Sequence, residues 1–184
     1  CAIKSEAANM QRLIEKLLFL ARSDQNKHSI TKIPLATEPL LSEIFQETRL
    51  IAPNHQVVLE KNEPATIFAD PVYLKEMLRI FIENSIKYTP ECGTICLASQ
   101  KTDDALTITV TDTGIGIPAE DQPKIFDRFY RVDKSRSKAT GGAGLGLSIA
   151  RWIVEQHSSS IELTSSPGMG TKVTVKIPCA NEKN

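Results

Sequence analysis

The sequence predicts an α+β fold: a two-layer sandwich with one mixed, mostly antiparallel sheet covered by about three helices, preceded by an N-terminal helix. Polar and apolar residues alternate in adjacent segments near 94–99 and 105–111, and again near 160–165 and 171–177. Such pairs are typical of neighbouring strands that lack a crossover helix. The 184 residues are 41% hydrophobic, which is enough to bury the core of one domain of this size.

Residues 2 to about 25 are predicted to form one helix with a broad apolar stripe that needs a partner. The partner could be a second chain, a preceding helix or the following domain, and the alternative is a helix docked on its own domain. Because the sequence begins at Cys1 inside this helix, we expect it to be a piece of a longer protein. The stripe recurs at alternating spacings of four and three, as in a heptad seam, and consists of Ile3, Ala7, Met10, Ile14, Leu17 and Ala21, widened by Leu13, Leu18 and Leu20.

A polar segment that closes with Pro34 indicates a linker between this helix and a compact domain. The predicted division is helix 1–26, linker 27–35, domain 36–180 and tail 181–184.

Within the domain, the clearest helix should begin after the N-cap Asp70 and end at Thr89-Pro90. Two short strands are expected on either side of the turn Asn62-Glu63-Pro64. The predicted helices are about 38–52, 71–88, a short one near 119–126, and 144–157.

The charge balance argues against a nucleic-acid partner, because Lys+Arg and Asp+Glu both number 22. No apolar run approaches the roughly 20 residues that span a bilayer. We therefore expect any membrane attachment to come from regions outside this sequence.

The predicted strand 105–111 runs into Asp112, which is followed by Gly114 and Gly116. A carboxylate at the end of a buried strand can accept a hydrogen bond from a ligand. The glycines allow the backbone to turn sharply and to approach that ligand closely. Ordinary turns also use Asp-x-Gly, so this loop alone does not define a site.

Three polar side chains, Asn84, Lys87 and Tyr88, share one face near the C-terminus of the predicted helix 71–88. An Asn oxygen can bind Mg²⁺, a Lys can meet phosphate, and a Tyr can lie against a base. An ordinary polar helix end is the alternative interpretation.

A second glycine cluster, residues 141–146, opens the predicted helix 144–157 and could bind phosphate through its free N–H groups. The cluster lacks the Lys and Ser/Thr of a Walker loop. The preceding segment 124–138 is basic and aromatic, and we interpret it as a lid that closes over phosphates. A solvated loop anchored by Phe126 and Phe129 is the alternative.

Four motifs resemble, in identity, order and spacing, the N, G1, F and G2 boxes of sensor histidine kinases. They are Asn84-Ser-Ile-Lys-Tyr-Thr-Pro, Asp112-Thr-Gly-Ile-Gly-Ile-Pro, Phe126-Asp-Arg-Phe-Tyr-Arg and Gly142-Ala-Gly-Leu-Gly-Leu-Ser. The segment Gly168-Met-Gly-Thr resembles a further glycine box of that family. The resemblance covers about residues 36–178.

This resemblance implies the Bergerat ATP-binding fold, shared with gyrase, MutL and heat-shock chaperone ATPases, and ATP and Mg²⁺ as cofactors. It implies that Asn84 coordinates Mg²⁺ and that Lys87 contacts phosphate, as the catalytic pair. Tyr88 would line the nucleotide, and Asp112 would accept a hydrogen bond from the adenine amino group. The other nucleotide-binding residues that it implies are Gly114, Gly116, Ile117, Phe126, Arg131, Gly142, Gly144, Leu145, Gly146, Leu147 and Thr171.

The implied function is that of the catalytic domain of a two-component protein-histidine kinase. Residues 2–25 resemble the second helix of the dimerisation and phosphotransfer hairpin, but His28, His55 and His157 all lack the phosphoacceptor context. We therefore expect this chain to bind ATP without phosphorylating itself. The family implies a response-regulator receiver domain as partner, a homodimer in the full-length protein, and a cytoplasmic domain of a protein in the cell membrane.

Two departures from the family pattern keep alternatives open. Ile80 stands where many members carry a second Asn, and Ala143 stands where a Ser or Thr is frequent. Hydrolytic members of the wider fold place a Glu at the position of Ile80, so we expect negligible hydrolysis here. The alternatives are a gyrase- or chaperone-type ATPase and a nucleotide-binding interaction module of the anti-sigma kind.

Overall fold

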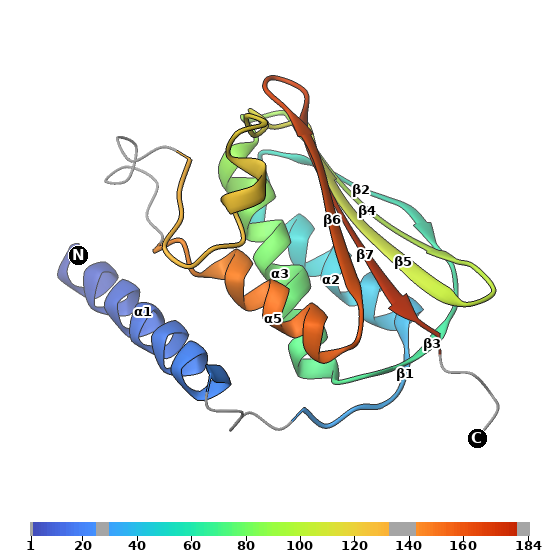
Figure 1. Ribbon diagram of the computed structural model, residues 1–184. Helices are drawn as coiled ribbons and strands as arrows, with labels where there is room; N and C mark the ends of the chain where they lie inside the picture. Colours follow the sequence, from blue (N-terminus) through green and yellow to red (C-terminus); the bar gives the residue numbers. More distant parts are fainter. Residues whose placement is uncertain (1, 25–29, 133–142, 180–184) are drawn as a thin grey trace.

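The structure, a computed structural model, describes residues 2–24, 30–132 and 143–179 (Figure 1). Its centre is a five-stranded sheet in which β2 runs parallel to β4 and every other neighbouring pair is antiparallel. The predicted mixed, mostly antiparallel sheet is therefore confirmed. In spatial order the strands are β2 (Gln56–Asn62), β4 (Thr94–Lys101), β5 (Ala105–Asp112), β7 (Gly170–Pro178) and β6 (Ser160–Ser166).

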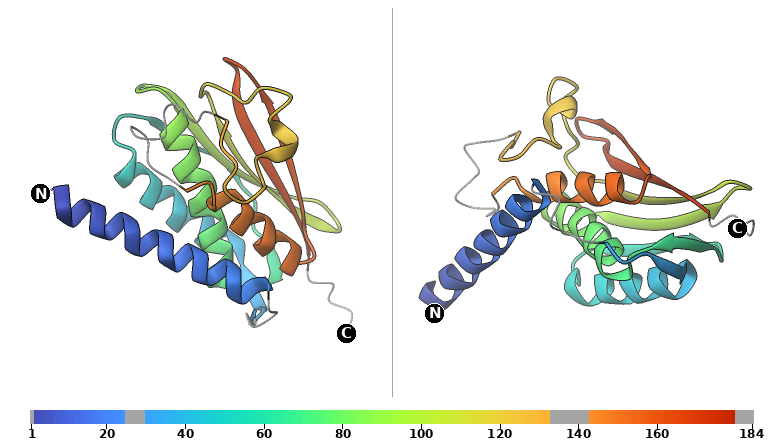
Figure 2. Two further views of the ribbon diagram at one scale, coloured as in Figure 1. Left: turned by 60° about the vertical axis from the view of Figure 1, so that its left-hand side comes forward. Right: turned by 60° about the horizontal axis from the view of Figure 1, so that its bottom comes forward.

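Three helices, α2 (Thr37–Ile51), α3 (Pro71–Tyr88) and α5 (Gly146–Gln156), cover one face of this sheet (Figures 1 and 2). Alternation along β5 explains why they do so, because Leu106 and Ile108 on one face are buried while the threonines between are only half-buried. The helices and this face form a single core, and the predicted two-layer sandwich is confirmed.

The long helix α3 has the limits that the sequence predicted. The Asp70 side chain caps it by accepting hydrogen bonds from the backbone N–H groups of Val72 at 3.0 Å and Tyr73 at 3.3 Å. At the other end the backbone becomes extended at Thr89, the residue before a proline. The helix therefore spans the layer and delivers its last turn to the end of β5 that carries Asp112.

The strands on either side of Asn62-Glu63-Pro64 both exist, but they do not pair with each other. β2 joins the main sheet, whereas β3 (Thr66–Ala69) pairs with β1 (Ile33–Ala36) in a separate antiparallel ribbon. β1 lies at the end of the segment predicted as a linker. β1 was not predicted, because its four residues carry too little periodicity, and its pairing with β3 has no local signal in the sequence.

The predicted short helix near 119–126 is reduced to one 3₁₀ turn, η1 (Gln122–Lys124). Pro123 has no backbone N–H, so it cannot donate the hydrogen bond that an α-helix requires at this position. Within the described residues, no helix combines the length and apolarity needed to cross a bilayer.

The N-terminal helix α1 (Ala2–Asp24) is docked on the domain near its C-terminal end only, and its N-terminal half projects away (Figure 2). The Phe19 ring lies edge-on to Trp152 of α5, with 5.0 Å between centroids, and 6.0 Å from Tyr73 of α3. On the N-terminal side of Phe19 an apolar stripe of the helix stays exposed. It consists of Met10, Leu13, Ile14, Leu17 and Leu18.

A buried histidine joins the end of α5 to the beginning of α3. Nε2 of His157 accepts a hydrogen bond from the Asp70 backbone N–H at 3.0 Å, and Nδ1 donates to the Ile153 carbonyl at 2.7 Å. Burial lowers the pKa of His157 below its ordinary value of 6.5, with Lys32 acting in the same direction and the Ile153 bond and the Asp70 charge opposing it. The neutral ring is thus the form that holds the two helices together.

We expect the fold to lose stability in mild acid through this histidine. The unfolded chain binds a proton near pH 6.5, above the folded pKa, so the contribution of His157 is complete above pH 6.5 and is lost as the pH falls through the folded pKa. Protonation breaks the bond to Asp70, which is worth about 1–3 kcal/mol for a buried donor. Urea unfolding between pH 5 and 8 should show a steeper loss of stability for the wild type than for His157→Gln, and parallel curves would contradict this role.

Candidate active site

The loop after β5 lies directly on the last turn of α3. The Ile115 backbone N–H donates to the Tyr88 carbonyl at 3.1 Å. A Cβ atom at Gly114 would lie 2.6 Å from that same carbonyl oxygen and 2.8 Å from Oδ1 of Asp112, which no real side chain tolerates. The glycine therefore permits the contact that brings Asp112 beside the polar end of α3.

Asp112 is 7% exposed and is held by three donors from different parts of the chain. Its Oδ1 accepts from the backbone N–H of Gly114 at 2.9 Å and of Thr171 at 3.1 Å. Its Oδ2 accepts from the Ser85 hydroxyl at 2.9 Å. A carboxylate offers about four acceptor positions, so about one remains, on Oδ2, for a donor from a ligand.

The predicted trio on α3 stands on this same turn. Asn84 and Lys87 are half-buried and Tyr88 is exposed, with the Lys87 ammonium 5.1 Å from the centre of the Tyr88 ring. The structure thus brings the turn of α3 that carries these three side chains against the loop that carries Asp112.

The side chains near Asn84 fit Mg²⁺ only if phosphate and water supply the other ligands of the ion. Ile80, one turn earlier, is buried in the core and offers no oxygen. In the part of the chain that the structure describes, no three His, Cys, Asp or Glu residues cluster as metal ligands. An Mg²⁺ ion here would bind the Asn84 amide oxygen, phosphate oxygens and water, which matches its preference for oxygen ligands and retained water.

The β6–β7 turn and the strand residues beside it hold the Asp112 loop through hydrogen bonds. The Ser165 hydroxyl accepts from the Ile117 backbone N–H at 2.9 Å and lies 2.9 Å from the Thr171 hydroxyl. The Gln122 side chain donates to the carbonyls of Ile117 and Ser165, each at 2.9 Å. Gly116 faces this turn, because a Cβ there would lie 1.9 Å from the Ser166 carbonyl oxygen. Ile117 and Gly116 therefore contribute backbone geometry here, whereas Thr171 also contributes its hydroxyl.

The second glycine cluster contacts the aromatic segment 124–132. The Phe129 backbone N–H donates to the Gly144 carbonyl at 2.9 Å. Phe126 and Arg131 are half-buried. Leu145 is buried and Leu147 packs against the core, so they anchor the beginning of α5 at Gly146. Gly142 and residues 133–138 of the predicted lid lie outside the described residues.

Ser85, Ser165 and Gln122 were missed by the sequence analysis. Ser85 had a detectable signal, because it follows Phe81 by four residues and so occupies a core-facing position of α3. A serine in an apolar stripe indicates a buried hydroxyl that needs a partner. Ser165 and Gln122 had no comparable signal, because the bonds that join the Asp112 loop to β6 span 48 residues from Ile117 to Ser165 and 43 from Gln122 to Ser165.

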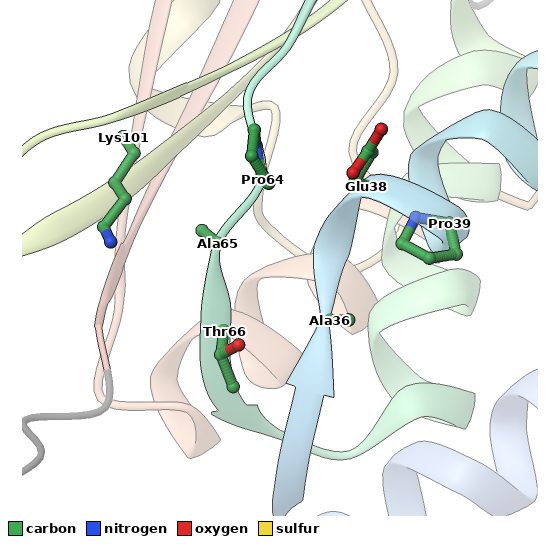
Figure 3. Close-up of a pocket in the computed structure, with 7 residues that line it drawn as sticks. All are labelled: Ala36, Glu38, Pro39, Pro64, Ala65, Thr66 and Lys101. Atoms are coloured by element: carbon green, nitrogen blue, oxygen red, sulfur yellow. The ribbon is translucent and has the colours of Figure 1, made fainter.

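A cavity of about 290 Å³ lies elsewhere, between the β1–β3 ribbon and the β4–β5 hairpin (Figure 3). Lys101 lines it and pairs with Leu106, whereas Asp112 pairs with Ile95 at the opposite end of the hairpin. None of the predicted site residues lines this cavity.

Comparison with known proteins places the chain in a family. Residues 69–181 match the family described as histidine kinase-, DNA gyrase B- and HSP90-like ATPases. The chain is 39% identical over 175 residues to the sensor protein CiaH of Streptococcus pneumoniae, covering 94% of this chain and 39% of that protein. It is 36% identical over 181 residues to the sensor histidine kinase YkoH of Bacillus subtilis, covering 95% and 38%. The chain thus spans about two fifths of the length of these relatives.

Solved structures of histidine kinases have a similar fold. The catalytic domain of histidine kinase ThkA matches with a TM-score of 0.65 and 26% identity, over 84% of this chain and all of that domain. Full-length ShkA, solved in complex with AMPPNP, matches with a TM-score of 0.79 and 24% identity, over 96% of this chain and 37% of ShkA. The predicted Bergerat fold is confirmed. The chain belongs to the histidine kinase-, DNA gyrase B- and HSP90-like ATPase family, and it contains the ATP-binding catalytic domain found in sensor histidine kinases.

Proposed function

We propose that this chain is the catalytic part of a two-component sensor kinase, which positions ATP·Mg²⁺ for transfer of the γ-phosphoryl group to a histidine on another helix. The observation that carries this proposal is the single acceptor position left on the buried Asp112 carboxylate, next to the polar last turn of α3. One N–H of an adenine amino group fits that position.

Each side chain of the last turn of α3 then has a role suited to its chemistry. Tyr88 is exposed and can lie against the adenine or the ribose. Lys87 brings a positive charge to the phosphates, and Asn84 offers an amide oxygen to Mg²⁺. Bound Mg²⁺ would neutralise charge on the phosphates. The other nucleotide contacts that we propose are Gly114, Gly116, Ile117, Phe126, Arg131, Gly142, Gly144, Leu145, Gly146, Leu147 and Thr171.

Among the described residues, no side chain is placed to activate water, which favours phosphotransfer over hydrolysis. Ile80 is buried in the core and carries no base. Glu83 is exposed at the surface of α3, away from the buried face that carries Ser85 toward Asp112. Positioning and charge neutralisation remain as the contributions of this domain, as in other phosphoryl transfers. The hydrolytic ATPase is the less favoured alternative for this reason.

The exposed stripe of α1 supports a role in assembly. We propose that residues 1–26 belong to a dimerisation and phosphotransfer hairpin, that 27–35 link it to the catalytic domain 36–180, and that 181–184 form a tail. An apolar stripe along a helix that is docked at one end needs further helices to cover it. The full-length protein would then be a homodimer. Its kinase domain would be cytoplasmic and attached to the cell membrane through other regions, and a response-regulator receiver domain would accept the phosphate.

The proposal is tested by supplying the histidine separately. The 184-residue protein and ATP labelled at the γ-phosphate are mixed with a polypeptide that carries a dimerisation helix with a phosphoacceptor histidine. We expect acid-labile label on that histidine, and Asn84→Ala should reduce the transfer rate by more than about 100-fold, because the metal site supplies several kcal/mol of charge stabilisation.

Other outcomes point to the alternatives. Rapid release of free phosphate without labelled histidine would favour the hydrolytic ATPase. ATP binding with neither reaction would favour a nucleotide-binding interaction module, and either result would overturn the kinase proposal.

A further inference from the structure

Ser85 is a polar side chain on the apolar face of α3. It is 4% exposed, and its hydroxyl donates to Oδ2 of Asp112 at 2.9 Å. A buried hydroxyl without a partner is destabilising, so this bond is the reason that a serine is tolerated among Leu, Met and Phe side chains.

The three donors around Asp112 have different effects on its carboxylate. Gly114 and Thr171 both donate to Oδ1, so they anchor one oxygen. Because the carboxylate is planar, these two bonds also orient Oδ2, but they leave both acceptor positions of Oδ2 open. Ser85 is the donor that holds Oδ2, and it comes from the rigid helix that also carries Asn84 and Tyr88. The direction of the remaining acceptor position is therefore set by α3.

We propose that Ser85 is a positioning residue for base selection: by holding Oδ2, it aims the one remaining acceptor position of Asp112 at a 6-amino purine. This inference rests on the proposed adenine contact of Asp112. It predicts that the gain in affinity from a 6-amino group and the loss of affinity from a 6-oxo group both depend on the Ser85 hydroxyl.

The selectivity follows from the chemistry of a fixed acceptor. A 6-oxo purine would place its carbonyl oxygen against Oδ2, which the Ser85 bond and the two bonds to Oδ1 hold in place. A purine without a 6-substituent neither gains the bond nor suffers this repulsion. Without the hydroxyl, a second acceptor position of Oδ2 is open to water, which can mediate contact with any of the three bases, so the difference between the bases should shrink.

The experiment compares binding of ATP, inosine triphosphate and purine riboside triphosphate to the 184-residue protein by calorimetry. We expect the wild type to prefer ATP. In Ser85→Ala the affinity for ATP should fall by about five- to tenfold, a fraction of the value of a charge-assisted hydrogen bond, while that for purine riboside triphosphate stays within about twofold. Ser99→Ala is the matched control, because Ser99 is also buried in the domain but its hydroxyl donates to Asn62, far from Asp112.

The outcomes separate this inference from the proposed function. A wild type that binds ATP and inosine triphosphate equally would remove the adenine contact of Asp112, and the role of Ser85 with it. A wild type that discriminates and a Ser85→Ala variant with the same ratio would overturn the role of Ser85 alone. Equal losses for all three nucleotides would mean that Ser85 is merely structural. Ser85→Cys, which keeps a weak donor, should give an intermediate ratio and decides the question if Ser85→Ala does not fold.

Discussion

Asp112→Asn should weaken ATP binding by about 100-fold or more while leaving the fold intact. The amide oxygen of the new side chain has to face the backbone N–H groups of Gly114 and Thr171, because both point at Oδ1. Its NH₂ group then replaces Oδ2 and meets the adenine amino group donor to donor. Loss of a charge-assisted bond together with an unpaired buried donor costs on the order of 3 kcal/mol, which corresponds to this factor in affinity.

Calorimetric titration with ATP measures the effect, and thermal unfolding provides the control. The fold should survive because the contacts of Oδ1 are kept and the Ser85 hydroxyl can reverse from donor to acceptor. An unchanged ATP affinity would contradict the role of Asp112. A variant that is unfolded at 25 °C would show instead that the carboxylate mainly holds the loop to β7.

The helices and long strands could be predicted because their signals are local. α3 has an N-cap at Asp70 and a proline after Thr89, and both ends lie where these residues put them. β5 and β7 alternate over eight and nine residues, which is long enough for their buried face to be recognised. β1 was missed, and β3 was expected as a strand without its partner, because each strand is only four residues long and their pairing is not encoded locally.

The residues of the candidate site could likewise be predicted from local motifs, whereas the long-range contacts between them could not. Motif identity and order predicted Asn84, Lys87, Tyr88 and Asp112, and the structure brings all of them to one end of the α3–β5 layer. The hydrogen bonds that hold the site were not predicted, because Ser165 meets Ile117 across 48 residues of sequence. No periodicity encodes such a contact. It is created only when the β6–β7 turn folds over the Asp112 loop.

Gly170→Ala should destabilise the domain by about 3–5 kcal/mol and abolish ATP binding with it. Gly170 begins β7 with a φ of +81°, and a Cβ atom there would lie 1.9 Å from the Asp112 carbonyl oxygen and 2.8 Å from its carbon. Backbone must therefore move, at the residue before the Thr171 N–H that holds Oδ1. Left-handed strain and overpacking each cost about 1–3 kcal/mol, and here they add.

Gly168→Ala is the matched control, because it isolates the strain from the clash. Gly168 lies in the same β6–β7 turn with a φ of +76°, but a Cβ there would meet no heavy atom within 4 Å. It should cost only about 1 kcal/mol, the price of a left-handed alanine, and leave ATP affinity unchanged. Urea unfolding of both variants measures the difference. Similar losses at the two positions would mean that β7 can shift away from Asp112, and that the contact of Thr171 with the carboxylate is not what fixes the adenine end of the site.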